Sequence, residues 1–97
     1  MRVIAKKTLR DFWEAHTDGE EPLLAWYREV EDEDWDTPAK VKQKYASASI
    51  VGDNRVVFNI KGNTYRLVVK INYAHRVVYI RFVGTHAEYD EIDVREI

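Results

Sequence analysis

Three successive runs of alternating apolar and polar residues constrain this chain most, because alternation gives each strand one buried face and one open face. The first run, "RVVFNIK", covers residues 55–61 and is followed by Gly62-Asn63, a dipeptide typical of a tight hairpin turn. The runs "TYRLVVKINY" and "RVVYIRFV" repeat the alternation over residues 64–73 and 76–83. The second half of the chain is therefore predicted to form a three-stranded antiparallel meander.

A register that opposes apolar residues to apolar residues aligns all three strands. Pairing Lys61 with Thr64 sets the first hairpin, with Ile60 opposite Tyr65, Asn59 opposite Arg66, Phe58 opposite Leu67 and Val56 opposite Val69. A turn at Ala74-His75 sets the second, with Tyr73 opposite Arg76, Ile71 opposite Val78, Val69 opposite Ile80 and Leu67 opposite Phe82. The apolar face is expected to pack on helices. The other face collects six polar side chains: Asn59, Lys61, Arg66, Lys70, Tyr79 and Arg81.

The first half of the chain carries the periodicity of helices, after a short predicted strand at residues 2–5. One amphipathic helix is expected to start at Thr8, in a capping-box-like sequence, and to end at Asp18-Gly19, where glycine suits a left-handed C-terminal conformation. A second helix is expected to have Pro22 in its first turn. Its predicted buried stripe consists of Leu23, Trp26, Tyr27 and Val30.

The acidic segment "EDEDWD", residues 31–36, is predicted to be a loop from which Trp35 docks onto the body of the protein. Thr37-Pro38 then indicates the start of a short basic helix. Residues 46–54 lead by a turn into the sheet.

Length and composition bound the class of protein. Ninety-seven residues with 45% hydrophobic content suffice for a single domain, spanning residues 1–97, with a modest core. No apolar run is long enough to cross a membrane and no signal-peptide pattern is present, so a soluble cytoplasmic protein is expected. The lack of cysteine excludes disulfides, thiol catalysis and cysteine-based zinc sites. His16, His75 and His86 show no metal-ligand spacing, and no cofactor is expected.

The net charge of −2 hides an uneven distribution of charge along the chain. Residues 11–36 hold eleven acids and a single base, Arg28, whereas residues 38–86 hold nine bases and a single acid, Asp53. Such asymmetry suggests that the basic part binds a polyanion. Acids and bases that merely face each other across solvated surfaces would give the same totals.

Cations on one sheet face, with a histidine just after the last strand, are suited to binding and cleaving a phosphodiester. Arginine offers a planar fork of donors to phosphate oxygens, and histidine exchanges protons near neutral pH. RNA carries its own nucleophile, the 2′-hydroxyl, so its cleavage needs proton transfer and charge stabilisation but no metal. Each residue also has a structural interpretation: Arg66 and Arg81 as solvated or ion-paired side chains, His86 as a capping residue and Tyr89 as core. His16 and His75 are expected to be structural.

The stretches "VFNIKGNTYRLVVKINY" and "VYIRFVGTHAEYD" closely resemble HigB toxins of bacterial type II toxin–antitoxin systems, within the RelE superfamily. The resemblance covers residues 37–93 well. It implies a RelE-like α+β fold, with two N-terminal helices packed on a small antiparallel β-sheet in the order β-α-α-(α)-β-β-β. It also implies an endoribonuclease that cuts translated mRNA on the ribosome and is neutralised by a helix-turn-helix antitoxin of the HigA type.

The same resemblance implies roles for individual residues. It assigns Arg66 and His86 to catalysis, with Tyr89 at the aromatic position just beyond. Lys61, Asn63 and Arg81 match RNA-contacting positions, and Lys70, on the same predicted face, joins that set. The alternative is a non-catalytic protein of the same fold that binds only RNA or the antitoxin. An interaction domain unrelated to nucleic acid would require the match to be a coincidence.

Overall fold

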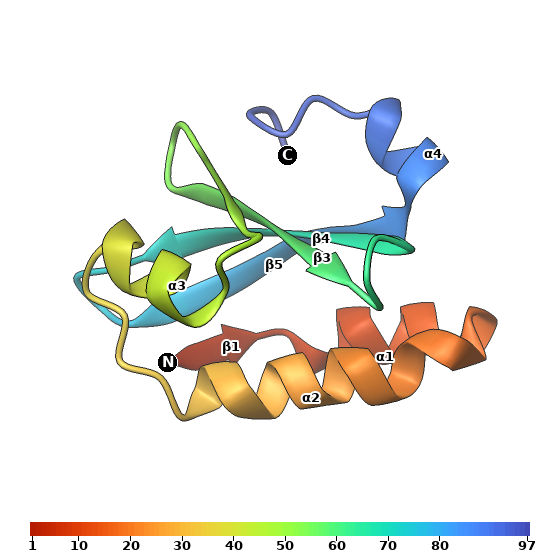
Figure 1. The fold of residues 1–97 in the computed structure, drawn as a ribbon, viewed down its shortest axis with the longest axis horizontal. Coiled ribbons are helices and arrows are strands. Elements are labelled where there is room, and N and C mark those ends of the chain that lie inside the picture. The colour runs from red at the N-terminus through yellow and green to blue at the C-terminus, as the bar shows by residue number, and fades with distance from the viewer.

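The computed structural model, which describes residues 1–97, contains one five-stranded sheet in the order β1-β5-β4-β3-β2 (Figure 1). The strands are β1 (Arg2–Ile4), β2 (Ser49–Val51), β3 (Arg55–Ile60), β4 (Tyr65–Asn72) and β5 (Val77–Thr85). The predicted meander forms the centre of this sheet as β3, β4 and β5. Strand β1 adds a parallel edge beside β5, and β2 adds an antiparallel edge beside β3. The predicted α+β fold is therefore confirmed, with a mixed sheet.

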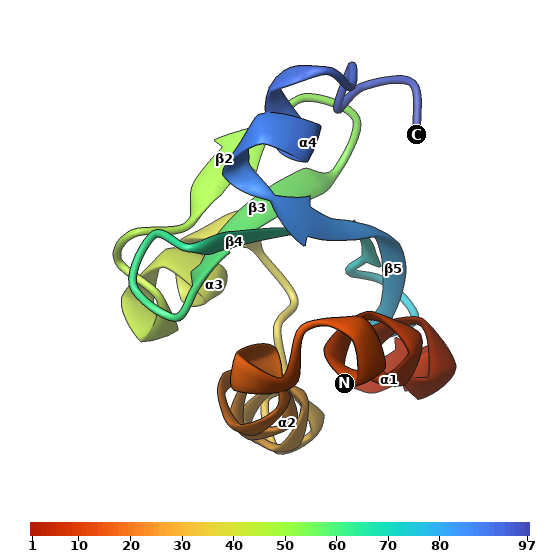
Figure 2. The same ribbon diagram turned by 90° about the vertical axis from the view of Figure 1, so that its right-hand side faces the viewer.

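Helices lie on both faces of the sheet. They are α1 (Lys6–Ala15), a 3₁₀ turn (Thr17–Gly19), α2 (Glu20–Glu31), α3 (Pro38–Lys44) and α4 (His86–Asp90). Figure 1 shows α1 and α2 together beneath the sheet, whereas α4 and the C-terminal residues lie over the opposite face, as the turned view in Figure 2 also shows. None of these helices combines the length and the apolar character that spanning a bilayer requires.

The core fills the space between the sheet and the helical layer. The predicted stripe of α2 supplies the buried Leu23, Trp26 and Val30, while Tyr27 packs partly buried against them. Phe58 of β3 is central, since its ring lies 5.4 Å from that of Trp26 and 6.2 Å from that of Trp35. Fully burying an apolar side chain of this size contributes about 1.5–3 kcal/mol.

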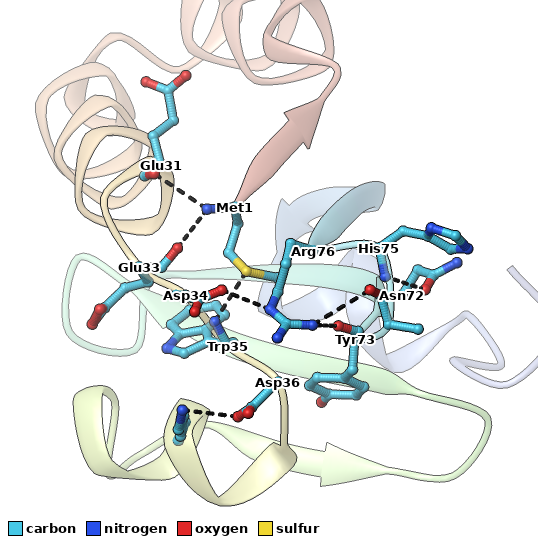
Figure 3. A network of polar contacts seen from close by, with 12 residues as sticks. Met1, Glu31, Glu33, Asp34, Trp35, Asp36, Asn72, Tyr73, His75 and Arg76 are labelled. Carbon is cyan, nitrogen blue, oxygen red and sulfur yellow. Dashed lines mark hydrogen bonds and ion pairs between the residues drawn. The ribbon is translucent and has the colours of Figure 1, made fainter.

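The acidic loop between α2 and α3 is held by specific contacts, drawn in Figure 3. Trp35 is buried, as expected, and its backbone N–H donates to the sulfur of Met1 at 3.1 Å. Beside it, the Nε–H of Arg76 donates to Oδ1 of Asp34 at 2.6 Å, which ties the loop to the turn between β4 and β5. One acid of the segment is thereby paired with a cation of the turn between β4 and β5.

The first hairpin has the predicted register, with Phe58 opposite Leu67 and Asn59 opposite Arg66. Its turn differs from the prediction. The ladder ends at Ile60 and Tyr65, and the residues with positive φ are Lys61 (53°) and Gly62 (64°). Asn63 does not have positive φ. Of the predicted turn residues Gly62 and Asn63, only Gly62 therefore adopts the positive φ that a tight hairpin turn requires.

Substitutions of Gly62 and Asn63 should have different effects on the free energy of unfolding. Gly62→Ala should lower the free energy of unfolding by about 1 kcal/mol, because a Cβ disfavours the left-handed conformation although nothing lies within 4 Å of it. Asn63→Ala should change it little, because Asn63 is exposed and has no positive φ. Chemical denaturation of both variants measures the difference. Equal losses would place the strain elsewhere in the turn.

The second hairpin keeps the predicted pairs Ile71–Val78 and Val69–Ile80 but not the pair Leu67–Phe82. Leu67 pairs instead with Val83, and Val68 pairs with Phe82. Arg81 is left out of the ladder as a β-bulge, which shifts the register of the strand end by one residue. A bulge of this kind bends a strand and re-aims its side chains.

The second face of the sheet is less open than predicted. Val57 and Val68 alternate onto this face and are 2% and 0% exposed. The segment that covers the face includes α4 and the C-terminal residues (Figure 2). Arg55, on the same face, donates from Nη2 to the backbone oxygen of Ile97 at 2.5 Å. The polar side chains therefore surround an apolar strip that the end of the chain covers.

Two helix boundaries were predicted wrongly. Helix α1 begins at Lys6 with Ala5 in the N-cap position, so Thr8 does not cap it, and it ends at Ala15. Gly19 has φ of −87°, outside the left-handed region. A Cβ there would lie 3.4 Å from the ring of Tyr65, an ordinary van der Waals contact, so neither conformation nor space requires glycine at this position. The predicted start of α3 is confirmed, with Thr37 as N-cap and Pro38 as first residue.

Candidate active site

Arg66 projects from the second sheet face, near the first-hairpin end of β4, into a set of contacts with three other side chains. It lies between Asn59 of β3 and Gly84 of β5 in the register. Its Nη1 donates to Oδ1 of Asn59, and its Nη2 lies 2.7 Å from Nε2 of His86. Its guanidinium carbon lies over the ring of Tyr89, 5.4 Å from the centroid. The three residues assigned to catalysis by resemblance are thus brought together in space.

The position of His86 is set by a capping box at the start of α4. Thr85 accepts at Oγ1 from the backbone N–H of Glu88 at 3.2 Å, and its own N–H donates to Oε1 of Glu88 at 2.8 Å. The backbone hydrogen bond from Thr85 lowers the pKa of Glu88, which keeps the carboxylate charged in this role. Reciprocal bonds of this type fix the direction in which a helix leaves a strand. His86 is the first residue of that helix and therefore faces Arg66.

The contact between Arg66 and His86 also fixes the state of the imidazole. A guanidinium can only donate hydrogen bonds, so Nε2 of His86 must accept. The proton of the neutral ring then resides on Nδ1, which lies 3.9 Å from Oδ2 of Asp90. In this arrangement Nε2 of His86 is the basic nitrogen, in contact with Arg66, and the carboxylate of Asp90 lies behind Nδ1. These are the features of a general base.

The guanidinium retains donors for a ligand. Its Nε–H is buried and has no partner, while Nη1 and Nη2 each use one hydrogen towards Asn59 and His86. One N–H remains on each Nη, and this pair forms the fork that recognises two phosphate oxygens. Arg66 can therefore bind an anion without leaving its place on the strand.

Gly84, directly opposite Arg66, leaves no room for a side chain. A Cβ at this position would come within 2.5 Å of Cζ of Phe82 and 3.1 Å of Oε1 of Glu88. The absence of a side chain at Gly84 therefore allows the capping box and the end of β5 to pack beside Arg66.

The four residues assigned to RNA contact do not gather at one point. Lys61 was predicted to lie on the same sheet face as Arg66, and this placement is wrong: Lys61 pairs through Nζ with Oδ2 of Asp18 at 2.7 Å, on the helical side of the hairpin. Asn63 lies in the exposed turn. Lys70 and Arg81 lie on the second face near Tyr79, towards the other end of β4.

The Asp18 contact shows what holds Lys61 on the helical side. Hydrogen bonds from Lys61 and then from the Tyr65 hydroxyl hold the pKa of Asp18 below the usual range of an aspartate. The turn puts Lys61 in this position because its positive φ ends the alternation one residue after Ile60.

His16 and His75 stand apart from the site, as expected. His16 stacks on Phe12 with a centroid distance of 4.4 Å and packs edge-on against Tyr65. His75 is exposed in the turn after β4, where only its backbone N–H makes a hydrogen bond, to Asn72.

Asn59 and Asp90 are site residues that the sequence analysis did not single out for a role. The predicted pairing of Asn59 with Arg66 was the available signal for the first. The sequence "THAE", a capping-box pattern just before Asp90, was the signal for the short helix that brings the second near His86.

Within the basic part of the chain, residues 38–86, the cations differ in whether they pair with a carboxylate. Four cations pair with carboxylates of the acidic half of the chain: Lys40 with Asp36, Lys44 with Glu29, Lys61 with Asp18 and Arg76 with Asp34. Arg66, Lys70 and Arg81 have no carboxylate within salt-bridge distance. Within residues 38–86, the cations without a carboxylate salt bridge are Lys42, Arg55, Arg66, Lys70 and Arg81, and four of these five lie on the second face.

The chain is similar to known proteins over most of its length. The family model described as "HigB_toxin, RelE-like toxic component of a toxin-antitoxin system" matches residues 19–92, a range that includes Asn59, Arg66, His86 and Tyr89. A protein named mRNA interferase toxin HigB, from Escherichia coli strain K12, is 30% identical over 92 residues, covering 93% of this chain and 88% of that protein. A protein named mRNA interferase HigB from Shigella flexneri has the same identity and coverage. Another of that name, from Escherichia coli O6:H1, is 21% identical over 94 residues, covering 95% of this chain and 91% of that protein.

Proposed function

Because the chain belongs to the HigB family of RelE-like toxins, we propose that it is an mRNA interferase that cleaves mRNA on the ribosome without a metal ion. Its partner would be a helix-turn-helix antitoxin of the HigA type, and its place of action the cytoplasm. The observation that carries the proposed activity is the contact between Arg66 and His86, 2.7 Å apart on a face whose cations lack carboxylate partners. A phosphate-binding fork and a proton acceptor are thereby placed side by side.

Substrate binding would change the partners of Arg66. A phosphate attracts the guanidinium more strongly than a neutral imidazole does, because a charge-assisted, bidentate contact replaces a single hydrogen bond. When Arg66 turns its fork to the scissile phosphate, Nε2 of His86 is released. That nitrogen can then accept a hydrogen bond from the adjacent 2′-hydroxyl. The resting contact thus holds His86 in the tautomer that the reaction needs.

The chemical step uses groups that the protein and the RNA carry. His86 takes the proton of the 2′-hydroxyl, the 2′-oxygen forms a bond to phosphorus, and the bond from phosphorus to the 5′-oxygen breaks. Arg66 stabilises the negative charge that builds on the phosphate oxygens during this exchange. The leaving 5′-oxygen takes a proton, for which the hydroxyl of Tyr89, beside Arg66, is the proposed donor. The products are a 2′,3′-cyclic phosphate and a 5′-hydroxyl.

Two side chains position this pair. Asn59 accepts from Nη1 of Arg66 and so orients the fork along the strand. Asp90 lies 3.9 Å behind Nδ1 of His86 and would stabilise the imidazolium that forms when His86 takes the proton. Neither touches the reacting atoms in this arrangement, so both are positioning residues.

Growth of a bacterial host tests the proposed function as a whole. Induced expression of the wild-type chain without an antitoxin should arrest growth, and the variant Arg66→Ala/His86→Ala should restore it, because the double substitution removes both the fork and the base. Soluble protein levels of the two chains, measured in the same cultures, provide the control. Normal growth with both chains, at equal levels of soluble protein, would reject the toxin activity. Arrest by both proteins would favour a non-catalytic protein that acts by binding.

A further inference from the structure

A hollow of about 500 Å³ lies on the second sheet face, away from Arg66. Its lining includes Lys70, Tyr79 and Arg81, together with the amide side chains Asn54 and Asn72. No acidic side chain lines it. Lys70 and Tyr79 are direct partners across β4 and β5, and Arg81, the bulged residue of β5, lines the hollow beside them.

The charges of this hollow are unpaired and its aromatic ring already stacks with a cation. Neither Lys70 nor Arg81 makes a salt bridge or a side-chain hydrogen bond with another residue of the protein. The guanidinium of Arg81 lies over the ring of Tyr79, 5.6 Å from its centroid. Two free cations, an accessible aromatic ring and amide groups form the combination with which proteins bind single-stranded nucleic acid.

The hollow and the Arg66 site lie along one strand. Lys70 is four residues beyond Arg66 on β4, so both point to the same face and their backbones are roughly 13 Å apart. Val68, between them on the same face, is buried, so an RNA strand that joins Arg66 to the hollow would pass beside this covered position. The Arg66 site lies at the start of β4, next to the turn from β3 and to the point where β5 continues into α4. The hollow lies at the other end of β4, next to the turn into β5.

We propose that Lys70, Tyr79 and Arg81 form a second RNA subsite, which stacks one base on Tyr79 and binds its phosphate with the two cations, beside the nucleotide that is cut. This proposal rests on the proposed function, since it concerns the same substrate.

Equilibrium binding tests the subsite apart from cleavage. The probe is a fluorescently labelled oligodeoxyadenylate, which lacks the 2′-hydroxyl and so cannot be cut by the proposed route. Tyr79→Ala should weaken binding about tenfold, whereas Tyr79→Phe should retain it, because stacking needs the ring and not the hydroxyl. Lys70→Gln and Arg81→Gln should each reduce the slope of log affinity against log salt by about 0.7. An abasic strand of the same length should bind wild type and Tyr79→Ala equally.

A matched control lies on the helical side of the protein. Lys6 stands over the ring of Tyr27 at 5.3 Å, so it is also a cation beside an aromatic ring, but in the helical layer. Lys6→Gln should leave affinity and salt slope unchanged. Unchanged binding in Tyr79→Ala, or equal slope changes in Lys6→Gln and Arg81→Gln, would overturn the subsite. A weakening of the abasic strand by Tyr79→Ala as large as that of oligodeoxyadenylate would also overturn it.

Failure of the proposed function would look different. If the wild type bound the probe through Lys70, Tyr79 and Arg81 but did not cut mRNA on ribosomes, the subsite would stand and the nuclease activity would be rejected. If the wild type cut mRNA while the three substitutions left probe binding and its salt slope unchanged, the activity would stand and the subsite would be rejected.

Discussion

His86→Ala should slow single-turnover cleavage of mRNA on programmed ribosomes by about 10²–10⁴-fold, the usual cost of losing a general acid or base. The imidazole is the proton acceptor nearest to the phosphate-binding fork, since its Nε2 lies 2.7 Å from Nη2 of Arg66. Ribosome binding should weaken much less, because the cations of the second face remain. Quenched-flow measurement with excess protein separates the rate of cleavage from the affinity.

His75→Ala is the control for this substitution. It also removes one imidazole, but from an exposed turn in which only the backbone of His75 makes a hydrogen bond. Its cleavage rate should match the wild type. A rate loss in His86→Ala no larger than its loss of binding would make His86 an RNA contact and remove it from the chemistry.

Arg66→Ala should reduce the same rate by about 10²–10³-fold, because the charge that builds on the phosphate loses its donor. Arg66→Lys should recover only part of that rate. Lysine keeps the positive charge but lacks the planar fork that contacts Asn59 and a phosphate together. The partial recovery distinguishes oriented donation from simple charge attraction.

Arg10→Ala provides the matched loss of one positive charge, since Arg10 is exposed on α1 in the helical layer. We expect it to change neither the rate nor ribosome binding by more than a small factor. Full recovery by Arg66→Lys would mean that charge alone matters at this position. Equal effects of Arg10→Ala and Arg66→Ala would mean that the site lies elsewhere.

Much of the sheet was predictable from the sequence, because a single requirement fixes it. Once Phe58 must oppose Leu67, a shift of one residue would turn the whole apolar set towards solvent. The pairing of Asn59 with Arg66 follows from the same register and is observed. The sequence therefore predicts half of the site geometry without knowledge of the helices.

The β-bulge was not predictable in this way. The sequence "VYIRFV" alternates well enough to continue the ladder, and nothing in it marks Arg81 as the extra residue. We infer that the position of the bulge depends on packing at the end of β5, where Gly84 lies close to the side chains of Phe82 and Glu88. Tertiary packing thus overrides a local pattern that favours regular pairing.

Two further errors have local causes. Lys61 was placed on the second face because alternation was carried one residue too far into the turn, where its positive φ reverses the side-chain direction. Strand β2 was not predicted because it is a short edge, with Ser49 and Ile50 exposed, and so shows no alternation of burial. Helix α4 was also not predicted, although the capping box of Thr85 and Glu88 was a readable signal for it.

The ends of the cleaved RNA test the central claim most directly. If Arg66 and His86 activate the 2′-hydroxyl, the upstream fragment should end in a 2′,3′-cyclic phosphate, or in the phosphate formed by its hydrolysis, and the downstream fragment should begin with a 5′-hydroxyl. Mass spectrometry of both fragments identifies these groups. Replacing the nucleotide at the cleavage position by its 2′-deoxy form should abolish cutting at that position while ribosome binding persists. An upstream fragment with a 3′-hydroxyl, or continued cutting of the 2′-deoxy substrate, would contradict the mechanism.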